Sequence, residues 1–164
     1  MATKRKAFDK LFAQLQDIKD ENGHLINTVL WSKNGDCSVI LAMRNPVPRF
    51  CTDAEQYINF TEILGNVIQT LGEGYALQKQ DIFVKRHYHH EVTDDMEFLT
   101  KSYFRHFEGR EYTDILTFLI ITQEAQRNLF IKYDPKRWMD FHTKVGKVCD
   151  ILTEKKIWNR KLTK

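Results

Sequence analysis

The segment from Tyr112 to Thr122 constrains the fold most, because it is nearly continuously apolar. A strand of this kind suits the middle of a sheet that is covered on both faces, where neither row of side chains meets water. We therefore expect a sheet with this segment inside it and helices packed against it. The 164 residues suit one domain, and a domain of that size buries roughly 70% of its unfolded surface.

The apolar periodicities along the rest of the chain predict an α+β fold with the element order α-β-β-α-β-α-β-α. The expected strands are 25–32, 37–43, 75–86 and 112–122, and the expected helices are 7–18, 52–71, 94–109 and 135–152. Because helices return the chain between the second, third and fourth strands, we expect right-handed crossovers. A β-hairpin plus these crossovers would form a mixed, roughly four-stranded sheet packed by helices.

Short motifs place the hairpin and the helix that follows it. Asn34-Gly35 predicts a two-residue hairpin turn, which demands a positive φ at both central residues. Thr52 and Glu55 have the spacing of a capping box, with Thr52 as the N-cap. Gly72 then ends the helix, because glycine adopts a left-handed C-cap without steric penalty.

The domain is expected to span residues 1–156 and to start with an amphipathic helix. Its last helix is expected to begin at Asp134-Pro135, where an N-cap precedes a first-turn proline. The remaining residues, 157–164, have few candidates for a core, so we interpret them as a basic tail or linker.

The net charge of +3 is too small to indicate a partner by itself. Basic residues do gather at both ends: Lys4, Arg5, Lys6 and Lys10 at one, and Lys155, Lys156, Arg160, Lys161 and Lys164 at the other. Solvated chain ends explain both clusters, and contact with anionic lipid or DNA phosphates is the alternative. We expect neither a membrane span, which needs ~18 apolar residues, nor a secretory leader.

The cysteines and histidines do not predict a metal site. Cys37, Cys51 and Cys149 are widely spaced without a Cys-x-x-Cys pair, and three free thiols fit a reducing cytosol. In His87-Tyr88-His89-His90 the first and third imidazoles share one side of an extended segment, but tetrahedral zinc needs two further ligands. A solvated strand end is the interpretation that we prefer.

Four motifs, ordered and spaced alike from about residue 25 to 123, resemble one family. They are the hairpin Ser32-Lys33-Asn34-Gly35-Asp36-Cys37-Ser38-Val39, the strand Gln78-Lys79-Gln80-Asp81-Ile82-Phe83, the helix Phe98-Leu99-Thr100-Lys101-Ser102-Tyr103-Phe104-Arg105-His106-Phe107, and the apolar strand 112–122. The match is to the amino-terminal domain of the TraG-type conjugation ATPases of Bacteroidetes conjugative transposons, relatives of the energising ATPase of type IV secretion systems. The chain departs from the family pattern at Ile82, where the family has tryptophan, and at Gln78, where it has histidine.

The resemblance implies a non-catalytic domain that docks and assembles a conjugative-transfer ATPase. None of the seven glycines lies in the Gly-x-x-x-x-Gly-Lys-(Ser/Thr) loop that cradles phosphates. We therefore expect no enzyme activity, no cofactor and no ATP binding in this chain, with the motor half beyond Lys164. The family setting implies a cytoplasmic protein at the inner-membrane secretion channel, with channel proteins as partners. Self-association and peripheral membrane contact are further options.

The motif strand and the motif helix supply the residues that we expect at an interface with protein partners. They are Lys79, Gln80, Asp81, Phe83, Arg105, His106 and Phe107. Because side chains alternate along a strand, burial of one strand face against the motif helix would leave the other face available. We expect the nearby aromatic residues Tyr103, Phe104, Phe107 and Tyr112 in the core, not as platforms for nucleic-acid bases.

Two other functions compete with the docking hypothesis. The first is a stand-alone nucleic-acid-binding accessory protein of a mobile element, which would use the basic ends. The second is a metal-dependent enzyme built on the histidines near His87, which is the weakest because tetrahedral zinc would need two more ligands from elsewhere in the fold.

Overall fold

The computed structural model describes residues 12–125 and 135–163. Across these residues the elements are β1 Phe12–Lys19, β2 Leu25–Ser32, β3 Cys37–Met43, α1 Val47–Phe50, α2 Ala54–Leu71, β4 Tyr75–His87, α3 Phe98–Phe107, β5 Glu111–Gln123, α4 Pro135–Glu154 and β6 Asn159–Lys161. The chain divides into two compact units. Asp81–Leu116 forms one, here named the ribbon unit, and residues 12–80, 117–125 and 135–163 form the other, named the core unit.

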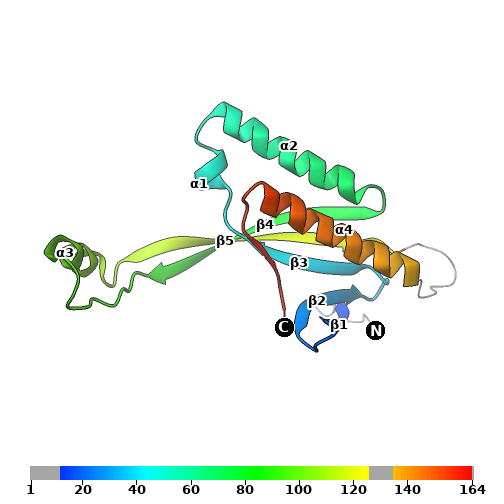
Figure 1. Cartoon of the computed structure of the whole chain (residues 1–164), viewed down its shortest axis with the longest axis horizontal. Coiled ribbons are helices and arrows are strands. Elements are labelled where there is room, and N and C mark those ends of the chain that lie inside the picture. The colour runs from blue at the N-terminus through cyan, green and yellow to red at the C-terminus, as the bar shows by residue number, and fades with distance from the viewer. Residues whose placement is uncertain (1–11, 126–134, 164) are drawn as a thin grey trace, which may run out of the picture. The chain divides into compact units, whose positions relative to one another are not determined.

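The core unit contains an α+β sandwich of one sheet and two long helices (Figure 1). The sheet has the strand order β1-β2-β3-β5-β4, and the pairs β1–β2, β2–β3 and β3–β5 are antiparallel. Helices α2 and α4 cover one face of it. Alternate residues of β3 and β5, such as Leu41 and Ile121, are buried beneath Val67 of α2 and Phe141 of α4. This apolar layer holds the core unit together.

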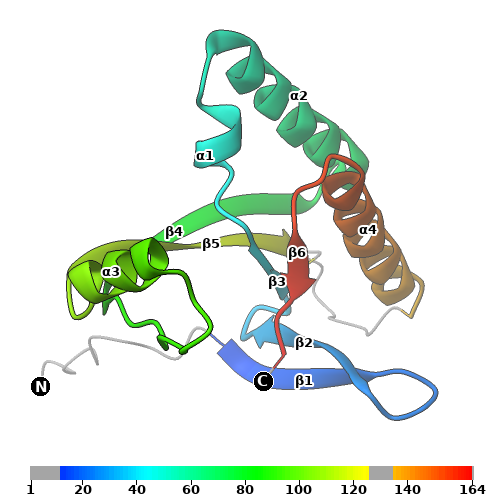
Figure 2. The ribbon, with the colours of Figure 1, turned by 60° about the vertical axis from the view of Figure 1, so that its left-hand side comes forward.

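The last strand, β6, lies in a fork between β2 and β3 (Figure 2). Strands β2 and β3 pair from Val29↔Val39 to Trp31↔Cys37, and β6 pairs with the other end of β3 through Leu41↔Lys161. Leu162 bridges both neighbours: its amide donates to the Ile40 carbonyl at 2.8 Å, and its carbonyl accepts from the Thr28 amide at 3.0 Å. The fork therefore leaves few strand groups unpaired.

The predicted α+β class and most of the element positions are confirmed, but the predicted four-stranded mixed sheet is wrong. Among the described residues the sheet has six strands, and β5 pairs antiparallel with β3. Local periodicity does not report the direction of a pairing between strands so far apart in the sequence. The predicted first helix is also wrong where it can be checked: Phe12–Lys19 is strand β1. The rest of that helix, like the predicted N-cap Asp134, lies outside the described residues.

The segment that follows α4 also differs from the prediction of a basic tail or linker at 157–164. Ile157 is buried in the core cluster, and Asn159–Lys161 is a strand. Backbone pairing, to which any residue type can contribute, explains why side chains gave no signal there. From Thr117 to Gln123 the central strand β5 is buried on one face and half-buried on the other, not covered equally on both.

Local geometry corrects the two motif predictions by one residue each. Gly35 has a φ of 87°, but Asn34 does not have a positive φ, so the turn is not the two-residue type. The Gly35 amide donates to the Ser32 carbonyl at 3.2 Å, which makes a three-residue loop ending in a left-handed glycine. Helix α2 starts one residue later than expected, and its N-cap is Asp53, whose carboxylate accepts from the Gln56 amide at 2.8 Å.

Candidate docking surface

The ribbon unit is a pair of strand segments that are joined through helix α3. It contains Asp81–His87 of β4, the connection to α3, and Glu111–Leu116 of β5. The Tyr88 amide donates to the Arg110 carbonyl at 2.8 Å, and the Gly109 amide donates to the Tyr88 carbonyl at 2.9 Å. Gly109 has a φ of 74°, a conformation that glycine adopts readily and that turns the chain from α3 into β5.

Ion pairs and aromatic contacts add to this backbone pairing. Lys85 Nζ lies 2.7 Å from Glu111 Oε1, and Arg86 Nε lies 2.9 Å from Asp114 Oδ2. These side chains are well exposed, and such surface pairs stabilise a fold by only ~0–1 kcal/mol each. The ring of Tyr88 packs against Phe104 and Phe107 of α3, with centroid distances of 6.5 and 6.3 Å.

No residue of the ribbon unit is buried, although all of Asp81–Leu116 is described. Its large apolar side chains face solvent: Phe83 is 69% exposed, Phe98 81% and Leu99 77%. A globular protein rarely leaves several large apolar groups uncovered within so short a stretch unless they meet a partner. The ribbon unit therefore presents an apolar surface that it cannot cover by itself.

Helix α3 has two unlike faces. Phe104 and Phe107 are half-buried against Tyr88, and the His90 ring lies tilted against Phe104 with the ring centroids 3.8 Å apart. Phe98, Leu99 and Tyr103 are exposed. The helix is thus anchored through one aromatic face while its other apolar side chains remain uncovered.

A charged pair joins the end of α3 to the histidine-rich connection. The His89 Nδ1 lies in hydrogen-bonding contact with Glu108 Oε1, and the His90 amide donates to Glu108 Oε2 at 3.4 Å. The hydrogen bond to Glu108 raises the pKa of His89, and the same bond lowers the pKa of Glu108. The pair links the histidine-rich connection to the residue that follows α3. Among the described residues, no group of three or more His, Cys, Asp or Glu side chains is arranged to hold a metal ion.

The predicted interface residues fall in both units. Lys79 and Gln80 are exposed on the part of β4 that belongs to the core unit, and Asp81 and Phe83 are exposed on the part that belongs to the ribbon unit. Arg105 and His106 are exposed on α3. Phe107 is half-buried, with the Arg110 guanidinium 5.2 Å from its ring centroid.

Two expectations about this region are wrong. The motif helix was expected to bury one face of the motif strand, yet residues 79–83 are all exposed. Helix α3 instead packs on Tyr88 and His90, because those rings lie in the connection that leads into it. Tyr103 and Tyr112 were expected in the core but are 58% and 46% exposed, since the ribbon unit has no second layer to bury them.

The exposed apolar residues Phe98 and Leu99 were missed as interface candidates. A signal was available, because apolar residues of the motif helix occupy more of its circumference than one packing face needs. Arg105 and His106, which follow directly on the same helix, add donors beside that apolar surface.

Comparisons with known proteins do not assign the chain to a family. Neither a scan against protein-family models nor a search of curated proteins finds a match. In the part of the chain that the structure describes, none of the helices has the length and apolar character required to cross a membrane.

Proposed function

We propose that this chain is a non-catalytic docking and assembly domain, with the ribbon unit as its contact surface for protein partners. The observation that supports this most directly is the exposure of Phe83, Phe98 and Leu99 in a unit without any buried residue. Burial of these side chains on a partner would release on the order of 25 cal/mol per Å2 of apolar surface, before the losses that association imposes.

The polar residues beside the apolar surface suit a specific contact. Arg105 and His106 are exposed next to Tyr103 on α3. Arginine and aromatic residues dominate the energetics of many interfaces, where truncation costs ~2 kcal/mol or more at a hot spot. The proposed contact therefore has apolar anchors with polar donors at their edge.

The resemblance to the TraG-type ATPases supplies the proposed setting. In that setting the chain is the amino-terminal domain of a conjugative-transfer ATPase, located in the cytoplasm at the inner-membrane secretion channel. Its partners would be channel proteins of type IV secretion, while a separate motor domain uses ATP. The motif strand and motif helix, which carry the resemblance, also supply most of the exposed surface described above.

The experiment is a pull-down of purified conjugation-channel components with the full chain and its variants. Phe98→Ala, Arg105→Ala and Asp81→Ala should each weaken capture, with the largest loss for the double variant of Phe98 and Arg105. Met139→Ala is the matched control, because Met139 is an exposed apolar residue of α4 in the core unit.

Circular dichroism must show that every variant stays folded. The proposal fails if the folded variants capture the channel components as well as the parent chain does, or if Met139→Ala weakens capture equally. Unfolding of the Arg105 and Asp81 variants would instead mean that these side chains maintain the fold.

A further inference from the structure

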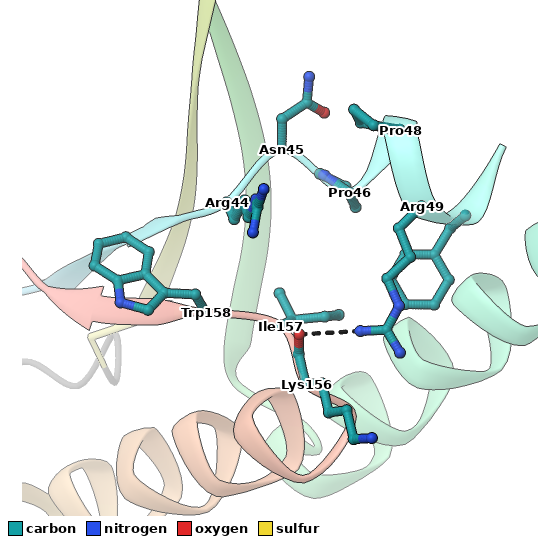
Figure 3. Close-up of a pocket in the computed structure, with 9 residues that line it drawn as sticks. Arg44, Asn45, Pro46, Pro48, Arg49, Lys156, Ile157 and Trp158 are labelled. Carbon is teal, nitrogen blue, oxygen red and sulfur yellow. Dashed lines mark hydrogen bonds between the residues drawn. The ribbon is translucent and has the colours of Figure 1, made fainter. Parts of the chain in front are cut away.

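A pocket of about 350 Å3 lies in the core unit, where the chain leaves β3 and where it leaves α4 (Figure 3). Residues 44–50 supply one wall and residues 156–158 supply the other. The Arg44 amide donates to the Trp158 carbonyl at 2.9 Å, so backbone bonding joins the two walls. The floor is apolar, since Phe50 and Ile157 are both buried. The pocket is therefore part of the folded core unit.

The turn after α4 sets the position of the second wall. The Lys156 amide donates to the Thr153 carbonyl and the Ile157 amide donates to the Leu152 carbonyl, both at 2.8 Å. This is the hydrogen-bonding pattern of a Schellman C-cap, which places one residue in the left-handed region. That residue is Lys156, with a φ of 57°, and no other described non-glycine residue has a positive φ. Lysine occupies a position that glycine would adopt more easily.

Three cations line the pocket and no acid does. They are Arg44, Arg49 and Lys156. Arg49 Nη1 donates to the Lys155 and Lys156 carbonyls, both at 3.0 Å, which holds this guanidinium in place while its other donors remain available. Figure 3 shows the side chains of Arg44 and Arg49 flanking Ile157. Within residues 12–125 and 135–163, no carboxylate forms an ion pair with any of the three cations.

A second cleft of the core unit differs from this pocket, because acids line it together with cations. It is about 260 Å3 in volume and contains Lys144, whose Nζ lies 3.5 Å from Asp140 Oδ2. The Tyr75 hydroxyl donates to the same carboxylate at 3.0 Å. The Asp140 carboxylate thus compensates the charge of Lys144 inside the cleft. The charges of the pocket beside Ile157 have no such compensation.

We propose that this basic pocket binds a phosphate of single-stranded nucleic acid, with Trp158 as the platform for an adjoining base. Several cations without an acid favour a phosphate, and the indole of Trp158 is 57% exposed at the rim. Stacking of a base on such an indole tolerates any sequence. Lys155 and Arg160 are exposed beside the lining residues, so positive charge continues beyond the pocket, as the backbone of a strand requires. This activity goes beyond docking, and its residues lie in the core unit, not in the ribbon unit.

The test is fluorescence anisotropy of the full chain with a labelled oligothymidylate, on the order of 20 nucleotides long, over a range of salt concentrations. Arg44→Gln and Lys156→Gly should each raise Kd about fivefold or more and lower the salt slope by about 0.7. Lys156→Gly suits the positive φ at this position, so it removes the charge without adding strain. Trp158→Leu should also raise Kd about fivefold or more, because it removes the stacking platform.

Lys147→Gln is the matched control, since Lys147 is an exposed lysine of α4 outside the pocket. It should change Kd less than twofold. An equal loss in this control would overturn the proposal, because attraction by overall charge would then explain the binding. The proposal also fails if AMP or an oligoglutamate peptide binds as tightly as the oligonucleotide with the same dependence on Arg44. If Arg44→Gln unfolds by circular dichroism, the folded Lys156→Gly and Trp158→Leu variants decide the outcome.

Discussion

The core unit and the ribbon unit use large apolar residues in opposite ways. In the core unit Phe141, Leu119 and Ile121 are at most 1% exposed, and they join one cluster across the sheet and both long helices. In the ribbon unit Phe98 and Leu99 are mostly exposed, and nothing in that unit is buried. The difference teaches that apolar residues in one chain can serve stability in one region and recognition in another. The composition alone does not separate these roles.

The largest effect is expected on the free energy of unfolding, when a buried and an exposed phenylalanine are each replaced by alanine. Phe141→Ala should destabilise the core unit by about 3–5 kcal/mol, because it leaves a cavity in the buried cluster. Phe98→Ala should change the free energy of unfolding by less than about 0.5 kcal/mol, because Phe98 is an exposed side chain. Urea denaturation of both variants measures the contrast. Similar losses in the two variants would mean that the ribbon unit contributes to the stability of the whole chain.

A smaller effect compares two glycines with the same backbone requirement. Gly35 has a φ of 87° in the core unit, and Gly109 has a φ of 74° in the ribbon unit. Valine at either position should store about 1–3 kcal/mol of local strain. Gly35→Val should therefore lower the main melting temperature, whereas Gly109→Val should leave that transition in place and weaken capture of the protein partner. Calorimetry checks the first expectation, and the pull-down checks the second. An unchanged melting temperature for Gly35→Val would contradict the hairpin geometry.

The smallest effect is expected from the protonation of two histidines whose pKa values are shifted in opposite directions. The hydrogen bond to Glu108 raises the pKa of His89, whereas burial, followed by the positive charge of Lys161, lowers the pKa of His142 in the core unit. The stabilising contribution of protonated His89 is complete below the ordinary histidine pKa of 6.5 and is lost as pH rises through its raised value. For His142 the sign reverses, so acidification through pH 6.5 and below should destabilise the core unit.

An NMR titration of both imidazoles measures these shifts. Glu108→Gln should return the pKa of His89 toward its ordinary value and leave His142 unchanged. Identical titration of His89 in the parent and the variant would show that the contact with Glu108 does not form in solution.

The sequence predicted the parts of the fold that carry their own local signal. Helices α2 and α4 follow from apolar residues at helical spacing, and β2 and β3 have the predicted bounds. Strand β1 was missed because its residues fit a helical period equally well. Pairing with β2 makes this segment a strand. Side chains of β2 add to the pairing: Trp31 Nε1 donates to Gln16 Oε1 at 2.9 Å, and the Thr28 hydroxyl donates to Asp17 Oδ1 at 2.7 Å. Such partners are too far away in the sequence for a local pattern of apolar residues to reveal them.

The candidate sites were predictable to different degrees. Arg105 and His106 were predicted as interface residues from the motif helix; both are exposed, and their role at an interface stays a prediction. The basic pocket had no motif, since Arg44 and Lys156 come to line one pocket only after the chain has folded.

Strand β6 has the sequence Asn-Arg-Lys, which has no apolar alternation from which a strand could be inferred.

The fork that holds β6 has a consequence for the order in which the protein folds. Leu41 pairs with Lys161, so the middle of the sheet is completed by a segment that lies far from β3 in the sequence. During synthesis, the parts of β2 and β3 that pair with the β6 segment remain unpaired until that segment has been made. Closing so long a loop is slow, and unpaired strand edges attract other chains until it closes. Strand β6 thus completes the sheet later than its neighbours, and the interval before it pairs is when the exposed edges of β2 and β3 are most prone to aggregation.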